Sequence, residues 1–190
     1  SQALTYAHLI WNQNYRKNLL HNCSSLLQQY DLIAAQCAEL FAWLGWLRAS
    51  ELFSICRDDV ELVPPSDGGV YGLPPNVGAI LLQLLPSTNS SRNKKVDVVI
   101  AWQTSSDLSL GCWLLSLFRV MDKLHWSSPH SFLFRSASDT SHWTSHYFRS
   151  THLYPLLHLQ YLQGDVTLRH IQPTSSHGIA YHFYSLHSYR

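Results

Sequence analysis

The sequence predicts a mainly α-helical domain with a small antiparallel β-sheet, an α+β fold. The first observation is a nearly continuous apolar segment of helix length, from Leu32 to Leu47. The second is a pair of runs rich in Val, Ile and Leu, Val77–Leu85 and Lys95–Trp102, joined by a short polar segment. The 190 residues are 46% apolar and only 13% charged, which indicates a folded chain. We therefore treat residues 1–190 as a single domain fragment.

The N-terminal half is predicted to contain two helices and a strand. Residues 5–22 have mixed polarity and form a predicted helix with Thr5 as its N-cap. The main helix runs from about residue 26 or 31 to residue 47 and has apolar residues on more than one face, as a buried helix requires. Val60–Val63 alternates like a short strand that two prolines end. Residues 64–76 are rich in Gly and Pro and form a predicted surface loop insertion.

The C-terminal half begins with a predicted hairpin, in which residues 86–94 join the two strands. Leu108–Leu124 is a predicted helix, because Ser105, Ser106 and Asp107 precede it as caps and a lysine lies in its last turn. Residues 127–140 are irregular. Ser141–Leu162 has a helical period that a proline at position 155 must kink or divide. A final helix without a clear start signal leads to the C-terminus.

Composition argues against several classes of protein. The four cysteines lie far apart without a C-x-x-C motif, so neither a zinc knuckle nor a disulfide framework is indicated, and a reduced intracellular compartment fits better. The first residues lack a basic region followed by an apolar one, so no signal peptide is expected. The apolar segment from Leu32 to Leu47 contains Gln36 and Glu39 and is too short and too polar to span a bilayer. No glycine-rich phosphate loop is visible. We expect no membrane and no small-molecule cofactor.

Two short motifs carry candidate chemistry. The first is Gly-Trp-Leu-Arg-Ala-Ser-Glu-Leu, in which Arg48 follows the apolar segment and Glu51 can orient or neutralise it. A guanidinium at the end of an apolar helix is costly to bury unless it meets an anion. The second motif is His-Ser-Tyr-Arg at the end of the chain, where His187 lies one helical turn from Arg190. The two motifs, in this order, resemble the arginine boxes of the tyrosine recombinase (phage-integrase-like) family. Their wording is most similar to recombinases of eukaryotic mobile elements.

The resemblance implies the catalytic-domain fragment of a site-specific recombinase, truncated at its C-terminus, with double-stranded DNA as its partner. In this family a tyrosine attacks a phosphodiester and leaves a 3′-phosphotyrosine without using a metal or a cofactor. Arg48 and Arg190 would clamp the phosphate, since an arginine fork donates two parallel bonds, and His187 would assist proton transfer or position the nucleophile. The family also implies a homo-oligomer on DNA. Its location would be intracellular, and nuclear if the organism is eukaryotic.

Two residues of the family pattern are not at their expected places. The family has a lysine on the hairpin as general acid for the leaving 5′-oxygen, but the segment just after the strand Leu81–Leu85 holds none. Lys94 and Lys95, at the start of the next strand, are the candidates, and they are equally consistent with solvated lysines that blunt a strand edge. The nucleophilic tyrosine should follow Arg190 by some tens of residues. No nucleophile is therefore expected in this chain, which alone should not cut DNA.

Three alternatives are also compatible with the sequence. The first is a non-catalytic DNA- or protein-interaction module, a degenerate recombinase relic, favoured by a formal net charge of only +1. The twelve histidines could add charge near an anionic backbone. The second is a zinc site, because His142 and His146 are spaced i, i+4 on one face of the predicted helix, but no third ligand follows at a fixed offset and we expect no metal. The third is an unrelated helical binding protein, in which Arg48 and Arg190 would lie far apart.

Overall fold

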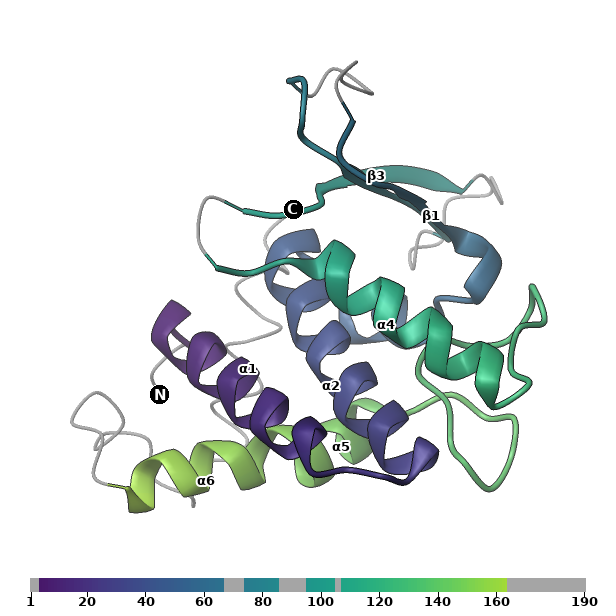
Figure 1. Cartoon of the computed structure of the whole chain (residues 1–190). Helices are drawn as coiled ribbons and strands as arrows, with labels where there is room; N and C mark the ends of the chain where they lie inside the picture. Colours follow the sequence, from purple (N-terminus) through teal and green to yellow (C-terminus); the bar gives the residue numbers. More distant parts are fainter. Residues whose placement is uncertain (1–3, 67–73, 86–94, 105–106, 164–190) are drawn as a thin grey trace.

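The computed structural model describes residues 4–66, 74–85, 95–104 and 107–163, and it confirms an α+β fold. Helices form the body of the molecule, and a three-stranded antiparallel sheet covers one end of them (Figure 1). The helical elements are α1 (Tyr6–His21), α2 (Leu26–Gly45), α3 (Ala49–Phe53), η1 (Arg57–Asp59), α4 (Leu110–Lys123), α5 (Ser145–Phe148), η2 (Arg149–Leu153) and α6 (Tyr154–Leu162). The strands are β1 (Val60–Val63), β2 (Ala79–Leu84) and β3 (Val96–Ala101).

Helix α2 is the centre of the core. Every residue from Ile33 to Ala42 is buried, which explains why the apolar segment is nearly continuous rather than periodic. Helices α1 and α4 both pack against α2. The predicted N-cap of α1 is confirmed, since the Thr5 side chain accepts a hydrogen bond from the backbone N–H of His8. Helix α2 ends at Gly45, two residues before the predicted end, because Trp46 adopts a left-handed conformation (φ 56°, ψ 37°).

The sheet has the order β1-β2-β3, and the predicted hairpin of β2 and β3 is confirmed. Ile80 lies opposite Ile100 in the register, and both side chains are buried against the helices. On the other face, Leu81 lies opposite Val99, which is exposed. At the ends of the predicted loop insertion, the backbone N–H of Asn76 donates to the carbonyl of Ser66 (2.8 Å). The strands alternate as a sheet with one buried face requires.

Helix α4 begins two residues later than predicted. Its cap is Ser109, whose hydroxyl accepts a hydrogen bond from the backbone N–H of Cys112. Asp107, one of the predicted caps, is therefore not the cap, and Ser105 and Ser106 lie outside the described residues. The sequence misplaced the start because several residues in a row have side chains that can cap.

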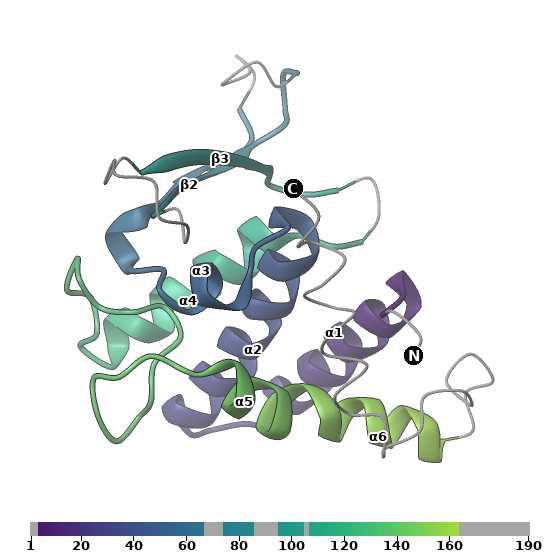
Figure 2. The same cartoon turned by 180° about the vertical axis from the view of Figure 1, so that it is seen from behind.

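Pro155 divides the C-terminal helical region as predicted, because α5 passes through the π-helical turn η2 into α6, which has the proline in its first turn. Figures 1 and 2 show α5 and α6 in one line across the base of the bundle. The helix starts at Ser145 and not at Ser141, since His142 pairs with Arg135 in an isolated β-bridge. His142 and His146 therefore do not share a helix face, which corrects the premise of the zinc alternative.

The described residues bear on two of the excluded classes, membrane proteins and metal-binding proteins. None of the helices in these ranges is long and apolar enough to cross a membrane. Within the same ranges, no group of three or more His, Cys, Asp or Glu residues is placed to hold a metal ion.

Candidate functional site

The first arginine box forms a sharp junction between two helices. Trp46 ends α2 in the left-handed conformation, Leu47 is buried, and Arg48 is the N-cap of α3. The backbone N–H of Arg48 donates to the Glu51 carboxylate (2.7 Å). Glu51 thus holds the main chain of Arg48, in the manner of the acidic residue in a capping box. This contact fixes the backbone of Arg48, a half-buried residue, and so fixes the point from which its side chain extends.

The chain runs from the arginine box straight into the sheet. Helix α3 ends at Phe53, and Ile55 donates a backbone hydrogen bond to the carbonyl of Leu52 and accepts one from Leu133. The 3-10 turn η1 then leads without a gap into β1. Because η1 is also in contact with β2, the arginine box is joined to the hairpin both along the chain and through packing.

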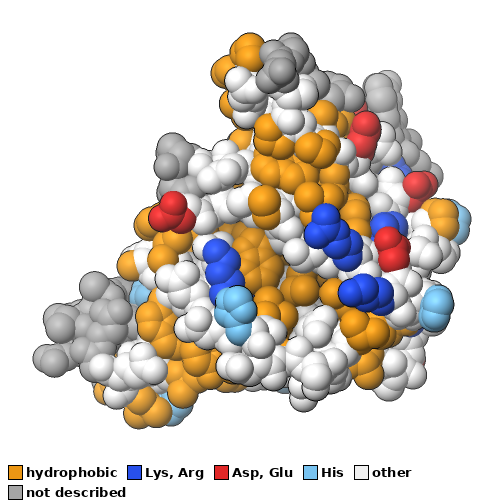
Figure 3. Space-filling view, in the orientation of Figure 1, with side chains coloured by type: hydrophobic (Ala, Val, Ile, Leu, Met, Phe, Trp, Pro, Cys, Tyr) orange, Lys and Arg blue, Asp and Glu red, His pale blue; other side chains and the backbone are white. Residues whose placement is uncertain are grey.

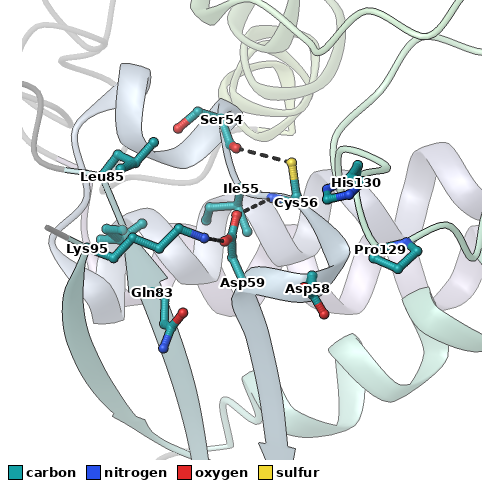
Figure 4. Close-up of a pocket in the computed structure, with 11 residues that line it drawn as sticks. Ser54, Ile55, Cys56, Asp58, Asp59, Gln83, Leu85, Lys95, Pro129 and His130 are labelled. Carbon is teal, nitrogen blue, oxygen red and sulfur yellow. Dashed lines mark hydrogen bonds and ion pairs between the residues drawn. The ribbon is translucent and has the colours of Figure 1, made fainter. Parts of the chain in front are cut away.

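Lys95, a candidate acid, immediately precedes β3 and forms an ion pair with Asp59 of η1 (Nζ to Oδ1, 2.6 Å; Figure 4). The other carboxylate oxygen of Asp59 accepts a hydrogen bond from the backbone N–H of Cys56 (2.9 Å). The hydrogen bond to Asp59 raises the pKa of Lys95 above its usual value. A general acid is most effective when its pKa lies near the working pH. Paired in this way, Lys95 is a poorer proton donor than a free lysine.

A pocket of about 220 Å³ surrounds this ion pair (Figure 4). In this view, Lys95 and His130 lie on opposite sides of the pocket, with Cys56 between them. Burial is the largest cause that raises the pKa of the Cys56 thiol, which makes it a weak nucleophile at neutral pH. The pocket therefore presents a charged ammonium group paired with a carboxylate, and a thiol whose raised pKa keeps it protonated. None of these groups is an activated nucleophile.

A second hollow lies between α1 and α4, with a volume of about 420 Å³. Figure 3 shows apolar side chains on its floor, with Lys and Arg side chains on both sides of it. Buried Gln13 accepts a hydrogen bond from the Trp113 indole (3.1 Å) and donates one to the carbonyl of Asp107 (3.1 Å). The side chain of Gln13 thus ties α1 to α4 at the edge of the hollow.

The sequence reasoning missed a buried polar network between α1, α2 and α6. The Arg16 guanidinium forms an ion pair with Glu39 (2.7 Å), and the two side chains are only 1% and 0% exposed. Arg16 also donates to Gln36 (2.8 Å), and Asn12 donates to both oxygens of Glu39 (3.1 Å each). Gln160 of α6 completes the chain by donating to Asn12 (2.6 Å). Gln36 and Glu39, which interrupt the apolar segment, are the sequence signal for this network. A polar or charged side chain on a buried helix requires a partner in the core.

Three predicted site residues, Lys94, His187 and Arg190, lie outside the described residues. The structure places Arg48, Glu51 and Lys95, and it brings Arg48 and Glu51 together. Comparison of the chain with protein-family models, with curated proteins and with solved structures found no match.

Proposed function

We propose that this chain is a DNA-binding fragment of a tyrosine-recombinase-type catalytic domain, in which Arg48 binds a backbone phosphate. The order of the elements is the observation that supports this proposal. A buried helix leads into the arginine box, and the box leads into an antiparallel sheet containing the β2–β3 hairpin. The family resemblance of the box implies this same succession of arginine and hairpin.

The local geometry suits a phosphate ligand. Arg48 lies at a helix start that is fixed by Glu51, so its side chain leaves the main chain from a defined point. A guanidinium group stays charged at all relevant pH values and can donate two parallel hydrogen bonds to a phosphate.

In the proposed reaction, DNA cleavage and rejoining proceed through a 3′-phosphotyrosine. By the same resemblance, Arg190 joins Arg48 on the phosphate, and His187 assists proton transfer. Either Lys94 or Lys95 serves as the acid for the leaving 5′-oxygen, and Lys95 must first exchange Asp59 for DNA. The functional unit on DNA is a homo-oligomer.

Titration of a fluorescent DNA duplex at several salt concentrations tests the DNA-binding proposal. Arg48→Ala should weaken binding about equally on unrelated sequences and lower the salt slope by about one, as expected for a phosphate contact. Arg48→Lys keeps the charge and should restore part of the affinity. Arg119→Ala is the matched control, since this exposed arginine of α4 carries the same charge outside the box. Equal losses for the Arg48 and Arg119 variants, or no binding at low salt, would contradict the proposal.

A second candidate function is a non-catalytic interaction module that keeps the recombinase fold. The Lys95–Asp59 pair favours it, because a candidate acid is neutralised by a carboxylate of its own chain. In such a module, Lys95 would anchor the base of β3 and take no part in DNA contacts.

A further inference from the structure

The two faces of the β-sheet have different surroundings. Figure 1 shows the helical body on one side of the sheet, and Ile80 and Ile100 are buried there. On the other side, which we call the outer face, Val99 is 49% exposed and lies opposite half-buried Leu81 in the register. A sheet face that meets only water usually carries polar side chains. The apolar pair at the centre of the outer face departs from this pattern.

A hollow of about 350 Å³ lies over the apolar pair. Glu61 of β1 and Asp97 of β3 line it together with Leu81 and Val99. Glu61 lies opposite Leu81 in the register, and Asp97 is two residues from Val99 on the same strand, so the four side chains share the outer face. Because β2 lies between β1 and β3, the two carboxylates flank the apolar pair from opposite edges of the sheet. The hollow thus has an apolar floor and acidic flanks.

The carboxylates of the hollow are open to a partner. Within the described part of the chain, the side chains of Glu61, Asp97 and Asp58 are exposed and form no hydrogen bond or ion pair. Asp59, the remaining acidic residue of the lining, pairs with Lys95. Unpaired carboxylates repel a DNA phosphate and attract a cationic side chain. Charge complementarity therefore requires a basic partner for the outer face.

We propose that the outer face of the sheet docks a basic amphipathic helix of a partner protein. This inference is independent of the proposed function. Strands two apart in a sheet are separated by roughly 10 Å, and the two-residue offset between Glu61 and Asp97 brings the distance between their Cα atoms to roughly 12 Å. A helix places lysines at positions i and i+7 about 10.5 Å apart on one face, with leucines at i+3 and i+4 between them. The flexible lysine stems span the remaining gap.

A helix suits this face better than other cationic ligands do. Helices packed against a sheet are a stable layer arrangement, which the inner face already shows. Leucine side chains of the partner remove the apolar surface of Leu81 and Val99 from water, and this contribution does not depend on charge. A polyamine or polylysine has the charges without the apolar stripe. The partner is therefore recognised by lysines that flank an apolar stripe on one helix.

The probe is a fluorescein-labelled synthetic helix with the spacing Lys-x-x-Leu-Leu-x-x-Lys and alanine elsewhere, and fluorescence anisotropy measures its affinity for the full chain. We expect saturable binding of this helix and no binding of a helix with glutamates in place of the lysines. Glu61→Lys should lower the affinity about tenfold, because it brings like charges together. Val99→Thr keeps the β-branched shape and should lower the affinity about threefold through lost apolar contact. Asp107→Lys makes the same charge change at an exposed acid outside the hollow and should have little effect.

A charge swap completes the test. A helix with one lysine replaced by glutamate should bind the Glu61→Lys variant more tightly than the wild-type chain, a gain that a folding defect cannot produce. Equal weakening by Glu61→Lys and Asp107→Lys, or equal binding of a helix with alanines in place of the leucines, would show non-specific attraction of cations and overturn the proposal. The absence of binding to the wild-type chain would also overturn it. Sedimentation of the chain alone tests the remaining occupant, because a dimer that Val99→Thr weakens would mean that a second copy, and not a partner helix, covers this face.

Discussion

The molecule contains two ion pairs of almost equal length in opposite environments. Arg16 and Glu39 pair at 2.7 Å between α1 and α2, where both side chains are buried. Lys95 and Asp59 pair at 2.6 Å at the base of the hairpin, where the lysine side chain is 45% exposed. The buried pair cannot be broken without leaving a charge in the core, whereas water or a ligand phosphate can take the place of Asp59 beside the half-exposed lysine. An ion pair therefore holds α1 and α2 together in the core, whereas the ion pair at the base of the hairpin can exchange its partner for a ligand.

The largest expected effect is the loss of stability when one partner of the buried ion pair is removed. Glu39→Ala leaves the Arg16 guanidinium buried without its carboxylate and removes the acceptor of Asn12. Removal of one partner of a buried pair costs about 3–5 kcal/mol. Urea denaturation should show this loss as a lower midpoint.

Replacing both partners sharpens the same test. In Arg16→Met with Glu39→Leu, no charge remains in the core, and the cost should be far smaller than for Glu39→Ala alone. If the single and the double variant are equally unstable, the network stabilises the fold through packing and not through charge pairing.

The next effect is a dependence of stability on pH, centred on His152. Its backbone carbonyl accepts a hydrogen bond from Arg16 (3.0 Å), and its ring stacks on Trp143 (4.6 Å between centroids). Burial, and then the positive charge of Arg16, lower the pKa of His152 from 6.5 to about 4. The unfolded chain therefore binds the proton more readily, and stability is lost as the pH falls from about 6.5 to about 4.

Denaturation at a series of pH values measures this loss, which should reach about 3 kcal/mol for a shift of this size. His152→Gln keeps the backbone acceptor and removes the titrating ring. Its stability should depend less on pH across this interval, although it should be lower at neutral pH through lost stacking. An unchanged pH profile in this variant would assign the loss to other groups.

The contrast also explains which parts of the fold could be predicted from the sequence. The ends of strands β1 to β3 are predicted to within two residues, because runs of Val, Ile and Leu between turns are a local signal. The predicted end of α2 is two residues too late, since nothing in the sequence Gly-Trp-Leu indicates that the tryptophan adopts a left-handed conformation. The buried network could be suspected from Gln36 and Glu39, but their partners Asn12 and Arg16 come from another helix. A side chain's distant partner is a property of packing, which local patterns do not encode.

For the candidate site, the motif predicts that Glu51 orients Arg48. The structure shows a hydrogen bond from the backbone N–H of Arg48 to the Glu51 carboxylate. The pairing of Lys95 with Asp59 could not be predicted, because it depends on the register that brings the start of β3 beside η1. Convergence of Arg48 with Arg190 and His187 stays a prediction.

The smallest expected effect comes from releasing the exposed pair. Asp59→Asn removes the charge that holds Lys95 and keeps an oxygen that can accept from the backbone of Cys56. The melting temperature should not change measurably, because exposed ion pairs contribute little. DNA affinity should rise more than in Asp58→Asn, a matched charge change in the same turn. Lys95→Ala should then weaken DNA binding more in the Asp59→Asn background than in the wild-type chain, since only a released lysine can reach a phosphate. Equal losses in the two backgrounds would mean that Lys95 does not exchange Asp59 for DNA, and the non-catalytic module would then be the better description.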